Sequence, residues 1–155
     1  MFQPVTLRAI TDLNRSAVLG LRVAAGQEGF VDGVDRSLRD AAEHPELAPW
    51  PRAVHAGERP VGFVMLADGV AAGNPDVPWP FYLWRMLIDG RFQGRGYGRA
   101  ALDAAVAHLR SGPDARELVT SVVPGEGSPL GFYLRYGFVE TGEMFDHERV
   151  LRLAL

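Results

Sequence analysis

Hydrophobic and polar positions alternate near the start of the chain. Val5, Leu7 and Ala9 are each separated by one residue, a period of two that predicts a first β-strand. The apolar residues of the segment 13–23 then recur at helical spacing, which predicts a helix through about Val23. The chain therefore begins with a strand followed by a helix.

The next segment is rich in glycine, acidic residues and proline. Residues 26–35 have the composition of an acidic loop. Ser37 with Asp40 three residues later matches a capping box, which predicts a short helix through about Glu43. Prolines at positions 45, 49 and 51 are expected to stop this helix, because proline removes a backbone donor.

Three strands are predicted in the middle of the chain. The apolar segments 52–56 and 61–67 flank a short Gly-Glu-Arg-Pro segment, which favours a hairpin. A loop rich in glycine and proline leads into the apolar segment 81–88, which ends directly at a second glycine-rich run.

The remaining elements complete a mixed order of helices and strands. Apolar residues recur at helical spacing between 102 and 109, and a Ser-Gly-Pro segment ends that helix. The later elements are a strand at 118–123, a short helix at 129–136 and strands at 138–143 and 149–155. The order β-α-α-β-β-β-α-β-α-β-β is that of an α/β protein, and 155 residues suit a single domain, 1–155.

The glycine-rich run from Ile88 to Arg99 joins a strand to a helix and predicts an anion-binding loop. Glycines let backbone N–H groups converge on phosphate oxygens, and a helix N-terminus adds its free N–H groups and positive dipole end. The structural alternative is a tight turn without a ligand. The run has no Gly-Lys-Ser/Thr ending, and Arg99 stands where a dinucleotide fingerprint needs glycine, so neither of those phosphate loops fits.

Composition excludes several classes of function. The formal net charge is −3 with no long basic run, so nucleic-acid binding has no electrostatic basis. The absence of cysteine excludes disulfides, thiolate metal sites and an acyl-cysteine intermediate. The four histidines lack ligand spacing, so no metal site is predicted. Without a signal peptide or a membrane-spanning apolar run, we expect a soluble cytoplasmic protein.

Two motifs together resemble the GCN5-related N-acetyltransferase (GNAT) family. The first is Gln93-x-x-Gly96-x-Gly98, and the second is Tyr133-x-x-x-Gly137-Phe138, separated from it by a helix and a strand. The resemblance implies a mixed, mostly antiparallel central sheet flanked by helices and acetyl-coenzyme A as co-substrate. Further similarity, in segments 29–31, 82–89 and 93–98, is to bacterial diamine and spermine/spermidine acetyltransferases.

The resemblance assigns cofactor contacts to the central strand and the loop after it. The strand residues, whose backbone would meet pantetheine and the acetyl carbonyl, are Met86, Leu87 and Ile88. The loop residues, which would hold the pyrophosphate, are Gln93, Gly94, Arg95, Gly96, Tyr97, Gly98 and Arg99. Many relatives carry an asparagine that contacts pantetheine where this chain has Glu126, and an ionised carboxylate cannot donate that hydrogen bond.

Tyr133 stands where the family places a general acid, which protonates the departing thiolate. The alternative for Tyr133 is that the ring only packs in the core, and Tyr136 is the expected packing residue.

Glu28 and Asp32 lie where polyamine-type relatives build part of the acceptor pocket, and Trp84 is assigned to substrate binding with them. Each carboxylate is equally well explained as part of a solvated acidic loop. Arg85 is expected to form an ion pair or to stack on Trp84.

The predicted function is therefore acetyl-coenzyme A-dependent acetylation of a small primary amine, with a polyamine or diamine as the first candidate. Attack would be direct, in a ternary complex. The alternatives are a different acceptor (an amino acid, a drug or a protein N-terminus) and a sensor that binds an acyl-coenzyme A without catalysis. Alternating leucines at 151, 153 and 155 suit either a sheet-mediated homodimer or an ordinary buried face.

Overall fold

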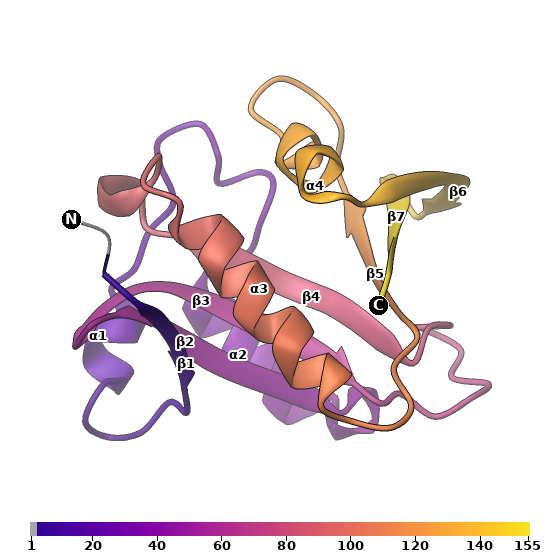
Figure 1. Ribbon diagram of the computed structural model, residues 1–155, viewed down its shortest axis with the longest axis horizontal. Helices are drawn as coiled ribbons and strands as arrows, with labels where there is room; N and C mark the ends of the chain where they lie inside the picture. Colours follow the sequence, from indigo (N-terminus) through magenta and orange to yellow (C-terminus); the bar gives the residue numbers. More distant parts are fainter. Residues whose placement is uncertain (1–2) are drawn as a thin grey trace.

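A seven-stranded sheet, in the order β1-β2-β3-β4-β5-β7-β6, forms the centre of the computed structural model, which describes residues 3–155 (Figure 1). The strands are β1 (Val5–Arg8), β2 (Pro49–Ala56), β3 (Arg59–Asp68), β4 (Phe81–Ile88), β5 (Glu117–Val122), β6 (Val139–Phe145) and β7 (Glu148–Ala154). The helices are α1 (Arg15–Leu19), α2 (Val34–Glu43), α3 (Tyr97–Arg110) and α4 (Leu130–Tyr136), with 3-10 turns at Pro45–Leu47 and Gly90–Phe92. Every strand pair is antiparallel except β4 with β5, which confirms the predicted fold class and element order.

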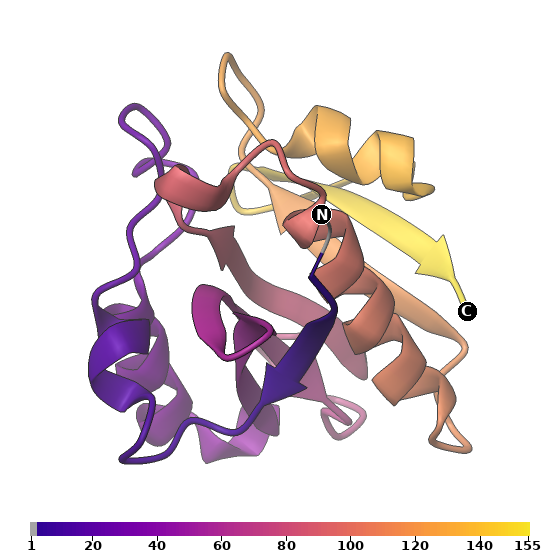
Figure 2. The same cartoon turned by 60° about the vertical axis from the view of Figure 1, so that its left-hand side comes forward.

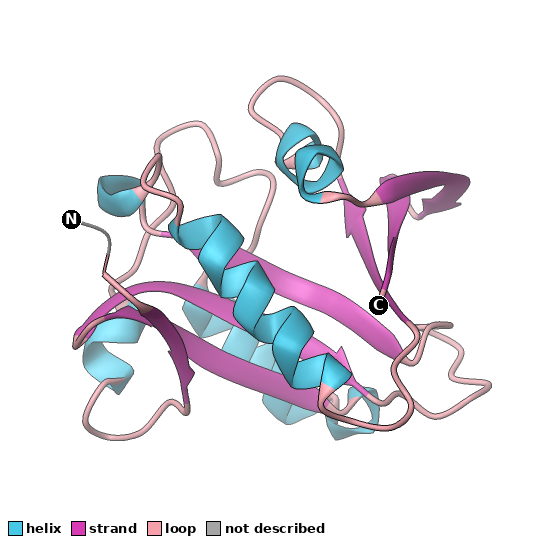
Figure 3. Cartoon of the chain, viewed as in Figure 1, coloured by secondary structure: helices cyan, strands magenta, loops and turns pink. Residues whose placement is uncertain are grey.

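The two faces of the sheet carry different helices. In Figures 1 and 3, α3 crosses the front of β2, β3 and β4, while α1 and α2 lie behind them. Leu83, Leu118 and Val122 pack in the core that includes the buried face of α3. Tyr82 and Val119 belong to a separate cluster. Since neighbouring residues of a strand point to opposite faces, this second cluster lies on the side away from α3.

β4 and β5 pair over only two residues each, near the start of β4 and in the middle of β5. Their register joins Tyr82 with Val119 and Leu83 with Thr120, and no further pair follows. On the other edge of β4, the pairing with β3 shifts next to Trp84, which is the extra residue of a β-bulge. Beyond this point β4 and β5 diverge, as Figure 1 shows, and β4 presents an unpaired backbone edge towards β5.

The early helix boundaries differ from those predicted. α1 ends at Leu19 rather than near Val23, because Gly20 caps it and the chain then turns towards β4. α2 begins at Val34, three residues before the predicted cap. Ser37 lies inside α2, buried, and donates its hydroxyl to the Gly33 carbonyl at 2.8 Å. The capping-box interpretation was therefore wrong.

The strand β2 begins at Pro49 and includes Pro51, whereas the sequence predicted a start at residue 52. β1 pairs only with residues 53–56 of β2, so the first half of β2 has one unpaired edge. Proline is compatible with a strand edge that needs no donor, which explains the longer strand.

The alternating leucines of β7 form an ordinary inner face. β7 lies between β5 and β6, so both of its edges are paired within the chain. Leu151 is fully buried, and Leu153 and Leu155 pack against the same core. β6 is the strand at that edge of the sheet (Figure 1), and in Figure 2 β7 is the yellow arrow that leads to the C-terminus.

Asp89 fixes the geometry at the end of β4. Its buried carboxylate accepts hydrogen bonds from the backbone of Arg22 and of Arg91 at 2.9 Å each, and from the Arg91 guanidinium at 2.8 Å. These bonds tie the segment after α1 to the loop after β4. The Arg91 hydrogen bond, with the backbone donors, lowers the pKa of Asp89 to about 2.

We predict that Asp89→Asn destabilises the fold by about 2 kcal/mol at neutral pH, because the ionised form is the one that these donors stabilise. The native pKa is depressed, so this stability is present above pH ~4 and is lost as the pH falls towards ~2. Urea unfolding of parent and variant should therefore give a difference that shrinks with acidification. Asp114→Asn, in an exposed loop, is the matched control. A difference independent of pH would contradict this account of Asp89.

Candidate functional site

A cleft of about 900 Å³ follows the opening between β4 and β5. Its walls come from β4, the loop after β4, the start of α3, the end of β5, helix α4 with the loop before it, and the loop before α2. Because β4 and β5 separate there, the cleft reaches side chains from both faces of the sheet. The carboxyl ends of neighbouring parallel strands are a common place for ligand binding in α/β proteins.

The glycine-rich loop forms one end of this cleft. Gly94 and Gly96 have φ angles of 76° and 84°, which other residues rarely adopt. Gly96 is the N-cap of α3, and no side chain caps this helix. The first intrahelical hydrogen bond of α3 runs from the Ala100 N–H to the Gly96 carbonyl. The backbone N–H groups of Gly98 and Arg99 therefore precede the first hydrogen bond of the helix. This arrangement suits an anion such as pyrophosphate.

Gln93 holds the loop against the end of β4. Its side-chain N–H group donates to the Ile88 carbonyl at 2.9 Å and to the Gln27 amide oxygen at 2.8 Å. The loop is thus tied to β4 and to the segment before α2. The Gln93 side chain has a positioning role in the structure, in addition to the phosphate contact expected for its position.

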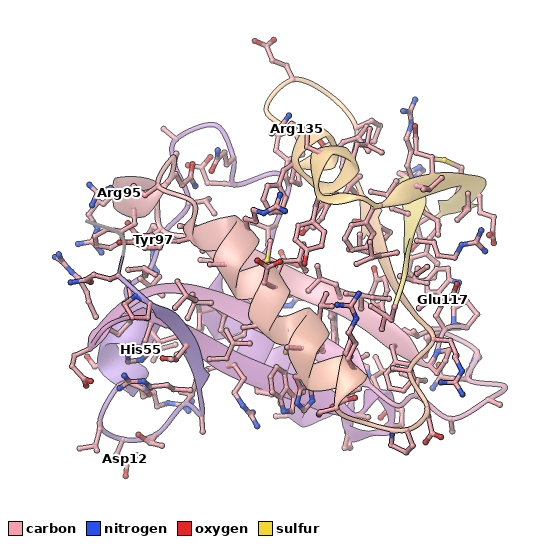
Figure 4. All side chains as sticks on the ribbon, in the orientation of Figure 1. Asp12, His55, Arg95, Tyr97, Glu117 and Arg135 are labelled. Atoms are coloured by element: carbon pink, nitrogen blue, oxygen red, sulfur yellow. The ribbon has the colours of Figure 1, made fainter. Side chains whose placement is uncertain are left out.

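Arginines surround the start of α3. In Figure 4, Arg95 and Tyr97 lie at this end of α3, across the molecule from Glu117 at the start of β5. Arg91 and Arg95 place their guanidinium groups 5.0 and 5.8 Å from the ring centre of Phe92. The charge of Arg95 adds to the positive end of the α3 dipole, whereas Arg91 is paired with Asp89 at 2.8 Å.

Tyr133 is buried on α4, and it also lines the cleft. Its ring lies edge-on between those of Phe132 and Phe138, with centroids 5.2 and 5.4 Å away. No group among residues 3–155 hydrogen-bonds to its hydroxyl. Burial raises the pKa of Tyr133, so the phenol keeps its proton at neutral pH. The residue thus packs in the core and presents a protonated hydroxyl to the cleft.

Tyr136, the expected packing residue, is half-buried against the same core. Its hydroxyl donates to Asp103 at 2.7 Å, and burial with this bond raises the pKa of Tyr136. Since that hydroxyl is engaged on α3, Tyr133 is the tyrosine of α4 that faces the cleft.

The structure brings most of the predicted site residues together. The residues that line the cleft are Glu28, Asp32, Trp84, Met86, Leu87, Ile88, Gln93, Gly94, Gly96, Tyr97, Gly98, Arg99 and Tyr133. Arg95 and Glu126 are exposed and are not part of its wall. Glu126 lies in the loop before α4, whose neighbours Gly127 and Ser128 reach the cleft instead.

Asp32 is engaged in an ion-pair network. Arg85 donates to Asp32 and to Asp40 at 2.8 Å each, and Arg36 pairs with Asp40 at 3.0 Å. Arg85 also lies 5.6 Å from the ring centre of Trp84, which confirms its expected pairing and stacking. Two arginines balance two aspartates, so the charge of Asp32 is largely neutralised. Glu28 accepts from the Gly26 backbone at 2.9 Å and has no such cation partner in the part of the chain described.

Sequence reasoning missed a second polar group in the cleft. Tyr82, Ser121 and Glu148 all line it, and they come from β4, β5 and β7. The Tyr82 and Ser121 hydroxyls are 2.5 Å apart, and Ser121 donates to Glu148 at 2.7 Å. Only the register of three strands brings these residues together, and no local motif marks them.

Neither a metal centre nor a membrane-spanning helix occurs in the part of the chain that the structure describes. No group of three or more histidine, aspartate or glutamate side chains within residues 3–155 could hold a metal ion. None of the helices within these residues is long and apolar enough to cross a bilayer.

The family follows from comparison with known proteins. The model of the acetyltransferase (GNAT) family matches residues 16–138, which include the glycine-rich loop and the tyrosine motif of α4. The chain belongs to this family. Its class is therefore that of an acyltransferase that uses acetyl-coenzyme A, as the sequence predicted.

Similar proteins include several amine acetyltransferases. The chain is 29% identical to the spermine/spermidine N(1)-acetyltransferase of Bacillus subtilis (strain 168) over 148 residues, which cover 95% of this chain and 96% of the relative. It is 31% identical to the chloroplastic serotonin N-acetyltransferase 2 of Oryza sativa subsp. japonica over 132 residues, 80% of this chain and 60% of the relative.

Solved structures share the fold at lower identity. The GNAT domain of S. lividans PAT has a TM-score of 0.73 at 17% identity, with 97% of this chain and 89% of that chain covered. AAC(6')-Ib in complex with ribostamycin and coenzyme A has a TM-score of 0.75 at 15% identity, with 98% and 94% covered. These similarities concern the arrangement of the elements.

We predict that Gly98→Asp weakens binding of acetyl-coenzyme A at least tenfold, because it places a carboxylate at the N-terminus of α3. Gly98 suits this test better than Gly96, since its φ angle is not positive and a Cβ there makes only ordinary contacts, with the Phe132 ring at 3.5 Å and Ile88 Cγ1 at 3.7 Å. Gly98→Ala is the matched control for size. Calorimetric titration of both folded variants measures the effect. Equal affinity of Gly98→Asp and the parent would exclude phosphate binding at this loop.

Proposed function

We propose that this protein transfers the acetyl group of acetyl-coenzyme A to a primary amine of a small molecule, with a polyamine or diamine as the preferred acceptor. The observation that carries this proposal is the cleft between the diverging β4 and β5. It joins an uncapped helix N-terminus suited to phosphates with the protonated hydroxyl of Tyr133 and with a group of carboxylates.

The proposed mechanism is direct attack of the neutral amine on the thioester in a ternary complex. The loop from Gln93 to Arg99 would hold the pyrophosphate of the co-substrate. Met86, Leu87 and Ile88 would align its pantetheine arm along the free edge of β4, and a backbone N–H there would stabilise the developing oxyanion. Tyr133 would then donate its proton to the departing thiolate.

The preference for a polyamine rests on the acidic lining of the cleft and on the similarity to the spermine/spermidine relative. Glu28, Asp32 and Asp76 all line the cleft, and Glu28 has no cation partner among the described residues. A carboxylate of this kind attracts the distal ammonium of a polycation. An aminoglycoside acceptor is the second candidate, since the AAC(6')-Ib complex contains ribostamycin in the same fold.

Tyr133→Phe should leave the fold and coenzyme affinity unchanged, because the ring keeps its contacts with Phe132 and Phe138 and loses only an unpartnered hydroxyl. We expect kcat to fall by about 10²- to 10⁴-fold, as for other general acids. Steady-state thiol release measures this. Tyr136→Phe is the control for a tyrosine on the same helix. Turnover of Tyr133→Phe within a few-fold of the parent would assign the proton to another donor.

Thiol release over a panel of amines tests the acceptor. We expect turnover of spermidine or a diamine, and Glu28→Gln should raise KM for spermidine several-fold more than for a short monoamine, because only the polycation has a distal ammonium. Asp35→Asn, exposed and paired with Arg39 at 3.3 Å, is the matched control. If the enzyme acetylates an aminoglycoside but no polyamine, the proposed acceptor is wrong and the proposed acetyl transfer stands. Coenzyme binding without thiol release for any amine would indicate a sensor.

A further inference from the structure

The second polar group of the cleft lies on the face of the sheet away from α3. Tyr82 packs with Val119 and Val150 in the cluster of that face, and Ser121 and Glu148 are two residues from Val119 and Val150 on the same strands. Because side chains two residues apart share a face, all three polar residues point to this side. Tyr133 approaches the same cleft from the α3 side.

The hydrogen bonds of this group have one consistent direction. Ser121 has a single hydroxyl proton, and it donates that proton to Glu148 at 2.7 Å. The short contact between Tyr82 and Ser121 must then have Tyr82 as the donor. The tyrosine oxygen keeps a free lone pair, which can accept a hydrogen bond from a group in the cleft. The chain of donors therefore leads from the cleft to Glu148.

We propose that Tyr82, Ser121 and Glu148 form a proton relay that deprotonates the acceptor amine, with Glu148 as the terminal base. The inference deepens the proposed function and rests on it. The ammonium gives one proton to the Tyr82 oxygen, Tyr82 passes its own proton to Ser121, and Ser121 passes its proton to Glu148. The neutral amine and a protonated Glu148 result, and the half-buried carboxyl group can release that proton to solvent.

The surroundings of the relay support this role for Glu148. Glu148 forms no ion pair with any arginine or histidine of the described residues, whereas Asp32 shares Arg85 with Asp40. The charged groups that affect the pKa of Tyr82 are Glu148 and Asp146 from the β6–β7 hairpin, which raise it, and Arg85 from β4, which lowers it. Asp76 lines the cleft as well, and His147 lies in the hairpin turn.

Burial raises the pKa of Tyr82 to about 12, so its phenol stays protonated at neutral pH and can act only as a relay. Its ring is fixed by stacking on Trp79 at 5.4 Å and by an edge contact with Phe145 at 6.2 Å. These contacts hold the hydroxyl at Ser121. The two proton-transfer tasks of the reaction thus belong to opposite sides of the sheet, with Tyr133 as the acid and the relay as the base.

The dependence of rate on the basicity of the acceptor tests the relay. An alkylamine with a pKa of about 10.4 is roughly 0.1% neutral near pH 7.4, whereas a weakly basic amine such as trifluoroethylamine is already neutral and needs no deprotonation before attack. Glu148→Gln, Ser121→Ala and Tyr82→Phe should each lower kcat/KM for the alkylamine by about 10²- to 10³-fold and change it less than about threefold for the weak base. At high pH the alkylamine rate of each variant should approach that of the parent.

Glu143→Gln, exposed in the same hairpin, is the matched control and should match the parent with both amines. Coenzyme affinity by calorimetry checks that each variant is folded. Equal losses for the two amines would overturn the relay and give Glu148 a structural or binding role. The relay would also be overturned if Tyr82→Phe or Ser121→Ala left kcat/KM for the alkylamine unchanged.

The proposed function can fail separately. If the parent releases thiol with neither amine, nor with the wider amine panel, the proposed function fails and the relay fails with it. If the parent acetylates both amines and the three variants keep its pH profile, only the relay is overturned.

Discussion

The separation of β4 from β5 is the constraint on which the site depends. Two parallel strands that continued to pair would close the sheet, and no ligand could reach the backbone of β4. The bulge at Trp84 changes the direction of β4 just beyond its last pair with β5. Backbone groups at an open edge need partners, and a ligand that lies along the edge can supply them. The opening thus creates both a space and a set of unpaired donors and acceptors.

Two anchors keep the end of β4 in place next to that opening. Asp89 accepts hydrogen bonds from the backbone of Arg22, after α1, and of Arg91, in the loop after β4, and the Gln93 side chain donates to the Ile88 carbonyl. The loop therefore has a defined position although its glycines are flexible residues. A preorganised cradle binds a phosphate with less ordering cost than a mobile loop would.

Because the opening passes through the sheet, chemistry can be divided between its faces. Tyr133 reaches the cleft from the α3 side, and Tyr82, Ser121 and Glu148 reach it from the other. Acyl transfer to an amine requires a proton acceptor for the nucleophile and a proton donor for the leaving group. In the proposed mechanism these two roles fall on opposite faces of the sheet, with Tyr133 as the donor and Glu148 as the terminal acceptor.

The sequence by itself determined the element order, the glycine-rich loop and the position of Tyr133, because each is marked by local spacing or by a short motif. It misjudged the start of α2, since Ser37 was available as a cap but is used inside the helix. Only the tertiary structure decided that Asp32 is neutralised by Arg85 and that Glu148 lies beside Ser121. Those contacts depend on strand register and helix placement over separations of 27 and 53 residues, distances at which local patterns carry no information.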